Sequence, residues 1–143
     1  MSHKIYAATI GLVLALAASA HAQTFSTLYT FTGGSDGDTP YAGVIEVNGN
    51  IYGTTFVGGT GYTGDVFEVT KNGKEKIIYT FGQPPDGNSP QAPLIRASNG
   101  KLYGVASFGG PYDNYGIVFE IDRTGAEKTL YSFAGGTADG CDP

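Results

Sequence analysis

The chain has very few of the residues on which most enzymatic and metal chemistry depends. It contains no tryptophan, one cysteine, one methionine and two histidines. Both histidines, His3 and His21, lie in an N-terminal segment that we expect to be removed, so the mature chain has none. Without histidine, serine and cysteine nucleophiles lose their usual general base, and zinc loses its commonest nitrogen ligand. We therefore predict no catalytic residues and no enzymatic activity of these kinds.

Basic residues are also scarce. The mature chain keeps seven of them, because Lys4 leaves with the N-terminal segment, against thirteen acidic residues. A net charge near −6 argues against nucleic acid or an anionic membrane surface as a partner, because both require concentrated positive charge. The single cysteine, Cys141, cannot form an intramolecular disulfide, which leaves an incidental thiol or a link between two chains.

Only one long apolar run is present, and it lies near the N-terminus. Residues 5–18 are almost all apolar or small, and Ala20-His21-Ala22 fits the small-x-small rule for signal cleavage. The run is too short to span a bilayer comfortably, and nothing later is apolar enough to stop transfer. We expect residues 1–22 to be a signal peptide and the protein to be secreted, periplasmic or on the cell surface, without membrane insertion. An uncleaved anchor is the alternative.

Helix patterns are absent from the mature chain, and a repeat takes their place. Leu28-Tyr29-Thr30-Phe31 returns as Ile78-Tyr79-Thr80-Phe81 and as Leu130-Tyr131-Ser132-Phe133, at separations of 50 and 52 residues. Other motifs keep the same order between these markers: Val66-Phe67-Glu68-Val69, for example, returns as Val118-Phe119-Glu120-Ile121. A fixed period of this size indicates stacked units, none of which buries its own faces alone.

Each period contains four short apolar or alternating runs separated by turn residues, which predicts four antiparallel strands. Asn-Gly pairs at 48–49, 72–73 and 99–100 favour tight hairpins because both residues tolerate positive φ. The expected strands are 41–47, 50–56, 65–70 and 75–81, then 93–97, 101–107, 116–122 and 127–133. We predict an all-β fold of four-stranded antiparallel blades of a β-propeller-like repeat, because four strands in about 50 residues is the pattern of a propeller blade.

The repeat boundaries give two complete blades plus partial flanking units. The tandem β-repeat domain, 23–143, divides into a partial unit at 24–31, repeat one at 36–81, repeat two at 86–133 and a truncated third unit at 139–143. Closed propellers need about four to eight blades. We therefore expect the chain to be a fragment of a longer propeller. The alternative is a ring assembled from several copies of the chain.

The combined motifs resemble a known family. Leu-Tyr-x-Phe, Asp-Gly-x-x-Pro, Gly-x-Ile/Leu-Tyr-Gly and Val-Phe-Glu-Val, taken together over nearly all of 24–143, resemble the tandem repeat of the GloVer-containing "choice-of-anchor" proteins of bacteria. The resemblance implies export, a repeat architecture and often a C-terminal surface anchor. It implies no catalytic residue.

Aspartate recurs at the start of each repeat. Asp36-Gly37-Asp38-Thr39-Pro40 and Asp86-Gly87-Asn88-Ser89-Pro90 occupy corresponding places. Alternating carboxylate and amide oxygens can ligate calcium, so the candidate calcium ligands are Asp36, Asp38, Asp86 and Asn88. An ordinary turn is the competing interpretation, with aspartate capping the backbone and glycine taking positive φ. Apart from this possible calcium, we expect no cofactor.

Two further groups are candidates for binding a ligand. Glu68 and Glu120 are equivalent positions that could flank a glycosidic bond, although repetition alone explains their recurrence. Tyrosines outside the repeated motifs are better candidates, because they fall in loops or at strand starts, where ligand contacts concentrate. These are Tyr41, Tyr62, Tyr112 and Tyr115.

We interpret the chain as an exported, non-enzymatic binding or surface-interaction module with an unknown glycan or protein ligand, on loops that vary over a constant scaffold. Two alternatives remain open: a carbohydrate-active enzyme that uses the repeated carboxylates, and a structural spacer without a ligand. Self-assembly is expected if two blades are the whole product.

Overall fold

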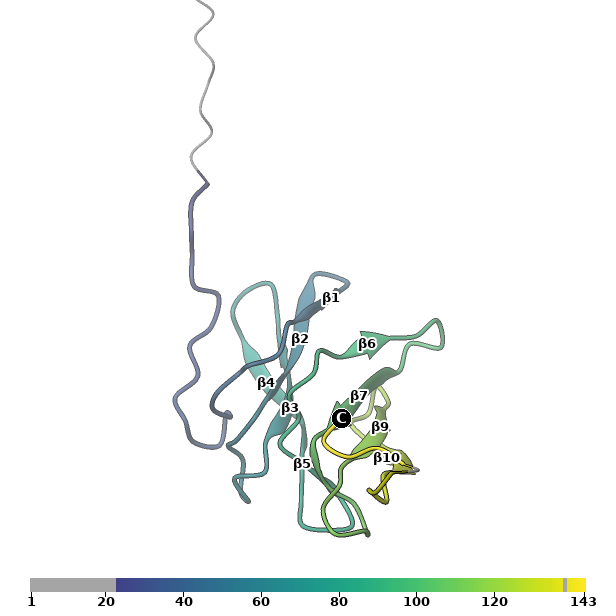
Figure 1. Ribbon diagram of the computed structural model, residues 1–143. Helices are drawn as coiled ribbons and strands as arrows, with labels where there is room; N and C mark the ends of the chain where they lie inside the picture. Colours follow the sequence, from purple (N-terminus) through teal and green to yellow (C-terminus); the bar gives the residue numbers. More distant parts are fainter. Residues whose placement is uncertain (1–22, 138) are drawn as a thin grey trace, which may run out of the picture.

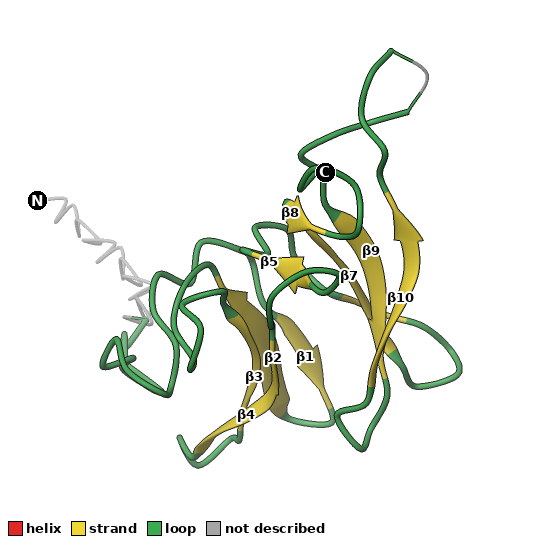
Figure 2. Ribbon diagram, turned by 90° about the horizontal axis from the view of Figure 1, so that it is seen from below, coloured by secondary structure: helices red, strands yellow, loops and turns green. Residues whose placement is uncertain are grey.

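The computed structural model describes residues 23–137 and 139–143, and the expected signal peptide, 1–22, lies outside them. The described chain is all-β: two four-stranded antiparallel sheets follow one another, with one small two-stranded sheet beside them (Figures 1 and 2). Within the described residues, no helix is long and apolar enough to cross a membrane.

The two large sheets are meanders in which each strand pairs with the next strand of the same sheet. The first sheet contains β1 (Ile45–Val47), β2 (Asn50–Thr55), β3 (Asp65–Val69) and β4 (Glu75–Thr80), paired in that order. The second sheet contains β6 (Ile95–Arg96), β7 (Leu102–Ala106), β9 (Ile117–Ile121) and β10 (Glu127–Ser132), paired in that order. All eight expected strands are therefore present, and two four-stranded sheets are confirmed.

The first strand of each sheet is shorter than the sequence predicts. β1 begins at Ile45 rather than at 41, and β6 covers two residues of the expected 93–97. In the second sheet Pro93 begins the segment, and proline cannot donate a hydrogen bond to a neighbouring strand, so pairing starts only after it.

The small sheet was not predicted. It pairs β5 (Gly87–Asn88) with β8 (Phe108–Gly109), and a single bridge between Asp38 and Val57 takes the same place in the first repeat. At Gly109 the φ angle is +88°, and an added Cβ would lie 2.1 Å from the carbonyl oxygen of Asp86. Glycine is therefore required where the Asp-Gly segment crosses the loop that follows the second strand.

Both sheets carry a register shift at the same repeat position. Between β3 and β4, Val66 faces Tyr79 while Phe67 faces Ile77, which leaves Ile78 as the extra residue. Leu130 is the extra residue of β10. Such a β-bulge locally changes how side chains alternate. Ile78 and Tyr79 both pack against the core between the sheets.

That core lies where the first sheet faces the second, a contact that we call the seam. It joins Val66 and Phe81 of the first repeat to Leu94, Ile117 and Phe119 of the second. The rings of Phe81 and Phe119 meet edge to face with centroids 5.1 Å apart, a geometry that aromatic pairs prefer. Neither sheet buries this face alone, as the repeat period predicts.

Residues 24–31 form no strand, yet they make the same contacts with the first sheet that β4, a fourth strand, makes with the second sheet. Phe31 meets Phe67 with centroids 4.9 Å apart, as Phe81 meets Phe119. The carbonyl oxygen of Leu28 lies against Gly73 of the first sheet, as that of Ile78 lies against Gly125. The segment therefore covers part of the outer face of the first sheet, at the places where β4 contacts the second sheet.

Candidate ligand-binding groove

A groove with a volume of about 250 Å³ opens along the seam. One of its walls is a row of side chains across the first sheet. Tyr52 faces Glu68 across the β2–β3 pair, and Glu68 faces Lys76 across the β3–β4 pair. Directly opposed residues share a face of a sheet, so the three side chains form one polar row. All three line the groove, together with Ile78.

The opposite wall comes from the second sheet. Arg96, Leu102 and Ile121 form a row there, because Leu102 faces both Arg96 in β6 and Ile121 in β9. Leu102 and Ile121 belong to the buried core. The groove therefore has an aliphatic floor beneath a guanidinium group.

Three turns surround the opening of the groove. Asn48 lies in the β1–β2 turn, Gly100 in the β6–β7 turn and Arg123 in the β9–β10 turn, and all three line the groove. The guanidinium group of Arg123 lies so close to Gly100 that a Cβ added there would meet one of its nitrogens at 2.6 Å. Arg96 and Arg123 are the only arginines of the chain.

Glu68 is held in place by its neighbours. Its Oε1 accepts hydrogen bonds from Asn50 Nδ2 at 2.5 Å and from the Tyr52 hydroxyl at 2.9 Å. Burial, together with the hydrogen bond to Glu68, raises the pKa of Tyr52, so the hydroxyl stays protonated and donates. This network fixes the ring of Tyr52 and one oxygen of Glu68 in the wall.

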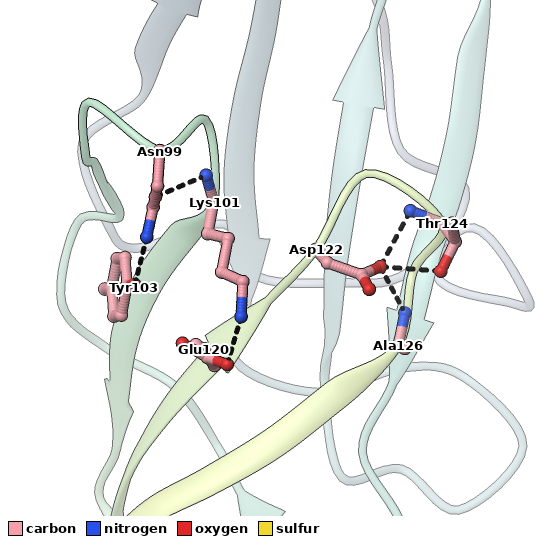
Figure 3. A network of polar contacts seen from close by, with 7 residues as sticks. All are labelled: Asn99, Lys101, Tyr103, Glu120, Asp122, Thr124 and Ala126. Carbon is pink, nitrogen blue, oxygen red and sulfur yellow. Dashed lines mark hydrogen bonds and ion pairs between the residues drawn. The ribbon is translucent and has the colours of Figure 1, made fainter.

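Asp122, at the opening of the groove, accepts hydrogen bonds only from its own β9–β10 turn among the described residues. Figure 3 shows its Oδ1 accepting from the backbone nitrogen and hydroxyl of Thr124 and from the backbone nitrogen of Ala126. These bonds lower the pKa of Asp122 because they favour the carboxylate. The turn that carries Arg123 is therefore well ordered.

The repeated glutamates lie on two different surfaces. Glu68 faces the seam, whereas Glu120 lies on the far face of the second sheet, because it alternates with Phe119 and Ile121, which face the seam. There Glu120 accepts from Lys101, while Asn99 donates to the Tyr103 hydroxyl (Figure 3). The second sheet separates the two carboxylates, so they do not flank one sugar-sized space.

The aspartates of the Asp-Gly motifs cap the loops in which they lie. Asp36 accepts four hydrogen bonds: from the Tyr29 hydroxyl, from the backbone nitrogens of Thr32 and Gly34, and from the Thr32 hydroxyl. These bonds lower its pKa to about 2. Asp86 accepts from Tyr79, Gly82 and Gly87 in the second repeat.

The remaining calcium candidates lie beside these caps. The backbone of Asp38 pairs with Val57, and Asn88 Oδ1 accepts from the Ser89 hydroxyl. In 23–137 and 139–143, no three Asp, Glu, His or Cys side chains are arranged to hold a metal ion. That search does not cover amide ligands such as Asn88, so the calcium site stays a prediction.

The four tyrosine candidates lie away from the groove. Tyr41 packs against Phe56 in the first repeat, and Tyr62 is exposed in the β2–β3 loop. Tyr112 lines a shallow depression with Leu130 and Tyr131 on the second sheet, and the Tyr115 ring lies against Gly135. Their role in binding stays a prediction.

Most of the groove is not evident in the amino-acid sequence. Tyr52 belongs to a recurring motif, which is explained by packing, and the two arginines belong to no motif at all. One signal was available: Arg96 occupies the repeat position of Glu46, because Arg96 faces Leu102 as Glu46 faces Ile51. A charge reversal at an equivalent position marks a residue that the scaffold does not require.

A family model described as the Gloeobacter/Verrucomicrobia repeat matches residues 2–143. The chain belongs to this repeat family. The match confirms the resemblance that the Leu-Tyr-x-Phe and Val-Phe-Glu-Val motifs indicated. A comparison with curated proteins found no match. In this Gloeobacter/Verrucomicrobia repeat protein, the groove lies between two repeats rather than within one.

Proposed function

We propose that this chain is an exported, non-enzymatic binding module whose ligand occupies the seam groove. The observation that carries the proposal is the convergence of both arginines of an acidic chain, with Lys76, on one concave site between two sheets. Concave sites with an apolar floor and a few directed polar groups are the usual ligand sites of proteins. The N-terminal pattern supports export.

We further propose that the two sheets are propeller blades and that each outer face packs against another blade. Ile95, Leu130 and Tyr131 are exposed on the outer face of the second sheet, whereas their counterparts in the first sheet pack against the seam core. On the first sheet, Val44 is 55% exposed while its counterpart Leu94 is 1% exposed. The two outer faces thus carry the two halves of the interface that the seam already forms.

A saccharide panel incubated with the purified full chain tests the proposed function. We expect binding to at least one saccharide, without release of new reducing ends, and weaker binding after Glu68→Gln. Glu120→Gln is the matched control, because it removes the equivalent carboxylate on the other face. Hydrolysis that either substitution abolishes would overturn the non-enzymatic proposal and favour the carbohydrate-active alternative. If no member of the glycan and protein panels binds, the alternative of a structural spacer without a ligand is favoured.

A further inference from the structure

The charges of the groove indicate what kind of ligand it takes. Among the described residues, Lys101 and Glu120 form the only ion pair, so neither Arg96 nor Arg123 has a carboxylate partner. The acidic residues of the lining do not serve as partners: Glu68 binds Asn50 and Tyr52, and Asp122 binds its own turn. The groove therefore presents two guanidinium groups that form no ion pair within the described residues, beside the carboxylates of Glu68 and Asp122.

Arginine at these positions favours a planar anion. A guanidinium group presents its N–H donors in a rigid fork that matches the two oxygens of a carboxylate, which a lysine cannot do. The two repeats differ at these positions: Arg123 occupies the position of Lys71, and Arg96 occupies that of Glu46. The second repeat thus has two arginines where the first has a lysine and a glutamate.

The rest of the lining favours a sugar around that carboxylate. Ile78 and the ring of Tyr52 are only partly buried and offer apolar surface, backed by the buried Leu102 and Ile121, which suits the C–H face of a pyranose. Asn48 and the second oxygen of Glu68 offer a donor and acceptors for hydroxyl groups. The volume of about 250 Å³ is below the roughly 300–1,000 Å³ of pockets that enclose drug-sized ligands, so the groove suits a single sugar residue.

We infer that the seam groove binds one uronic acid residue of an acidic saccharide, with its carboxylate between Arg96 and Arg123. This inference rests on the proposed function and adds the class of the ligand. The three surrounding turns leave the opening to solvent, so a longer saccharide can continue beyond the groove.

Titration calorimetry of the full chain with a galacturonic acid trimer tests the inference, with the galactose trimer as the neutral probe. We expect the acidic trimer to bind at least about tenfold more tightly, because bonds between charged groups exceed neutral ones. Arg96→Gln and Arg123→Gln should each weaken that binding by about tenfold, and added salt should weaken it further. Both side chains are exposed, so the variants should keep their circular dichroism spectrum and melting temperature.

Lys71→Gln is the matched control, because it removes a positive charge at the same repeat position as Arg123 but outside the groove. It should leave binding unchanged. Equal affinity for both trimers, insensitive to the arginine variants, would overturn the ligand class while the binding function stands. Binding of triglycine, with its free carboxylate, in place of any saccharide would also overturn the class. No binding by any probe would count against both proposals.

Discussion

The Tyr79 hydroxyl donates a hydrogen bond to Asp86 Oδ2 at 2.7 Å, and this pair ties the end of β4 to the Asp-Gly loop that opens the next repeat. The same pair recurs between Tyr29 and Asp36 and between Tyr131 and Asp139. Two of the family's motifs, Leu-Tyr-x-Phe and Asp-Gly, therefore specify one junction, seven or eight residues apart, that links successive units.

Tyr79→Phe should destabilise the fold by about 1–2 kcal/mol, because it removes a hydrogen bond to a charged, half-buried acceptor and keeps the ring. Urea unfolding followed by tyrosine fluorescence measures the change. Tyr131→Phe is the control, because its exposed pair with Asp139 should contribute less. Equal losses in the two variants would mean that burial does not strengthen the junction.

Leu94→Ala should cost about 2–5 kcal/mol, because it leaves a cavity in the seam core. Val44→Ala, at the equivalent but exposed position, should change the free energy of unfolding by less than about 0.5 kcal/mol. Thermal denaturation of both variants makes the comparison. A large loss for Val44→Ala would show that another surface covers the outer face of the first sheet in solution.

Gly109→Ala should prevent normal folding or cost well over about 2 kcal/mol, because the new Cβ would meet the Asp86 carbonyl oxygen at 2.1 Å. Gly49→Ala isolates the effect of backbone conformation, since Gly49 also has positive φ but no atom within 4 Å of an added Cβ. That control should cost about 1–2 kcal/mol. Yield and circular dichroism report folding. If Gly109→Ala and Gly49→Ala lose similar amounts of stability, the backbone can shift easily where Gly109 crosses Asp86.

Stability should rise as the pH falls from neutral toward 4.5 and then fall in more acidic solution. Burial raises the pKa of Glu75 and of Glu127 above the ordinary 4.5, so charging them costs stability, which protonation restores. Asp36 has the opposite sign: its contribution is complete above 3.8 and is lost as the pH falls toward about 2. Urea midpoints across this range give the profile. Glu127→Gln should stabilise the protein at neutral pH and flatten the upper part of the curve.

If the Asp-Gly motifs are ordinary turns, calcium should leave the melting temperature unchanged. Both carboxylate oxygens of Asp36 already accept hydrogen bonds from the loop, and those of Asp86 do the same. A bound ion would have to replace these donors. Melting curves in millimolar calcium and in chelator make the test. A higher melting temperature with calcium would show that the folded chain binds the ion, because binding to the folded state alone stabilises it.

The strands were predictable because their signals are local. Asn48-Gly49 and Asn99-Gly100 place the hairpins, and alternation places the strands around them. The β5–β8 pair was not predictable in the same way, because Gly87 meets Gly109 across 22 positions without any side-chain pattern. The groove was hidden for a related reason: Tyr52 and Arg96 come from different repeats, and only the stacking of the sheets brings them together.

The seam has a consequence for how a family of such proteins diversifies. In the proposed stacking of blades, each repeat would contribute one wall to the groove before it and a different wall to the groove after it, because the two faces of the second sheet differ, with Arg96 on one side and Glu120 on the other. The order of the repeats would then set which walls meet. Permuting or duplicating units along a chain would combine the walls in new ways without changing a single residue.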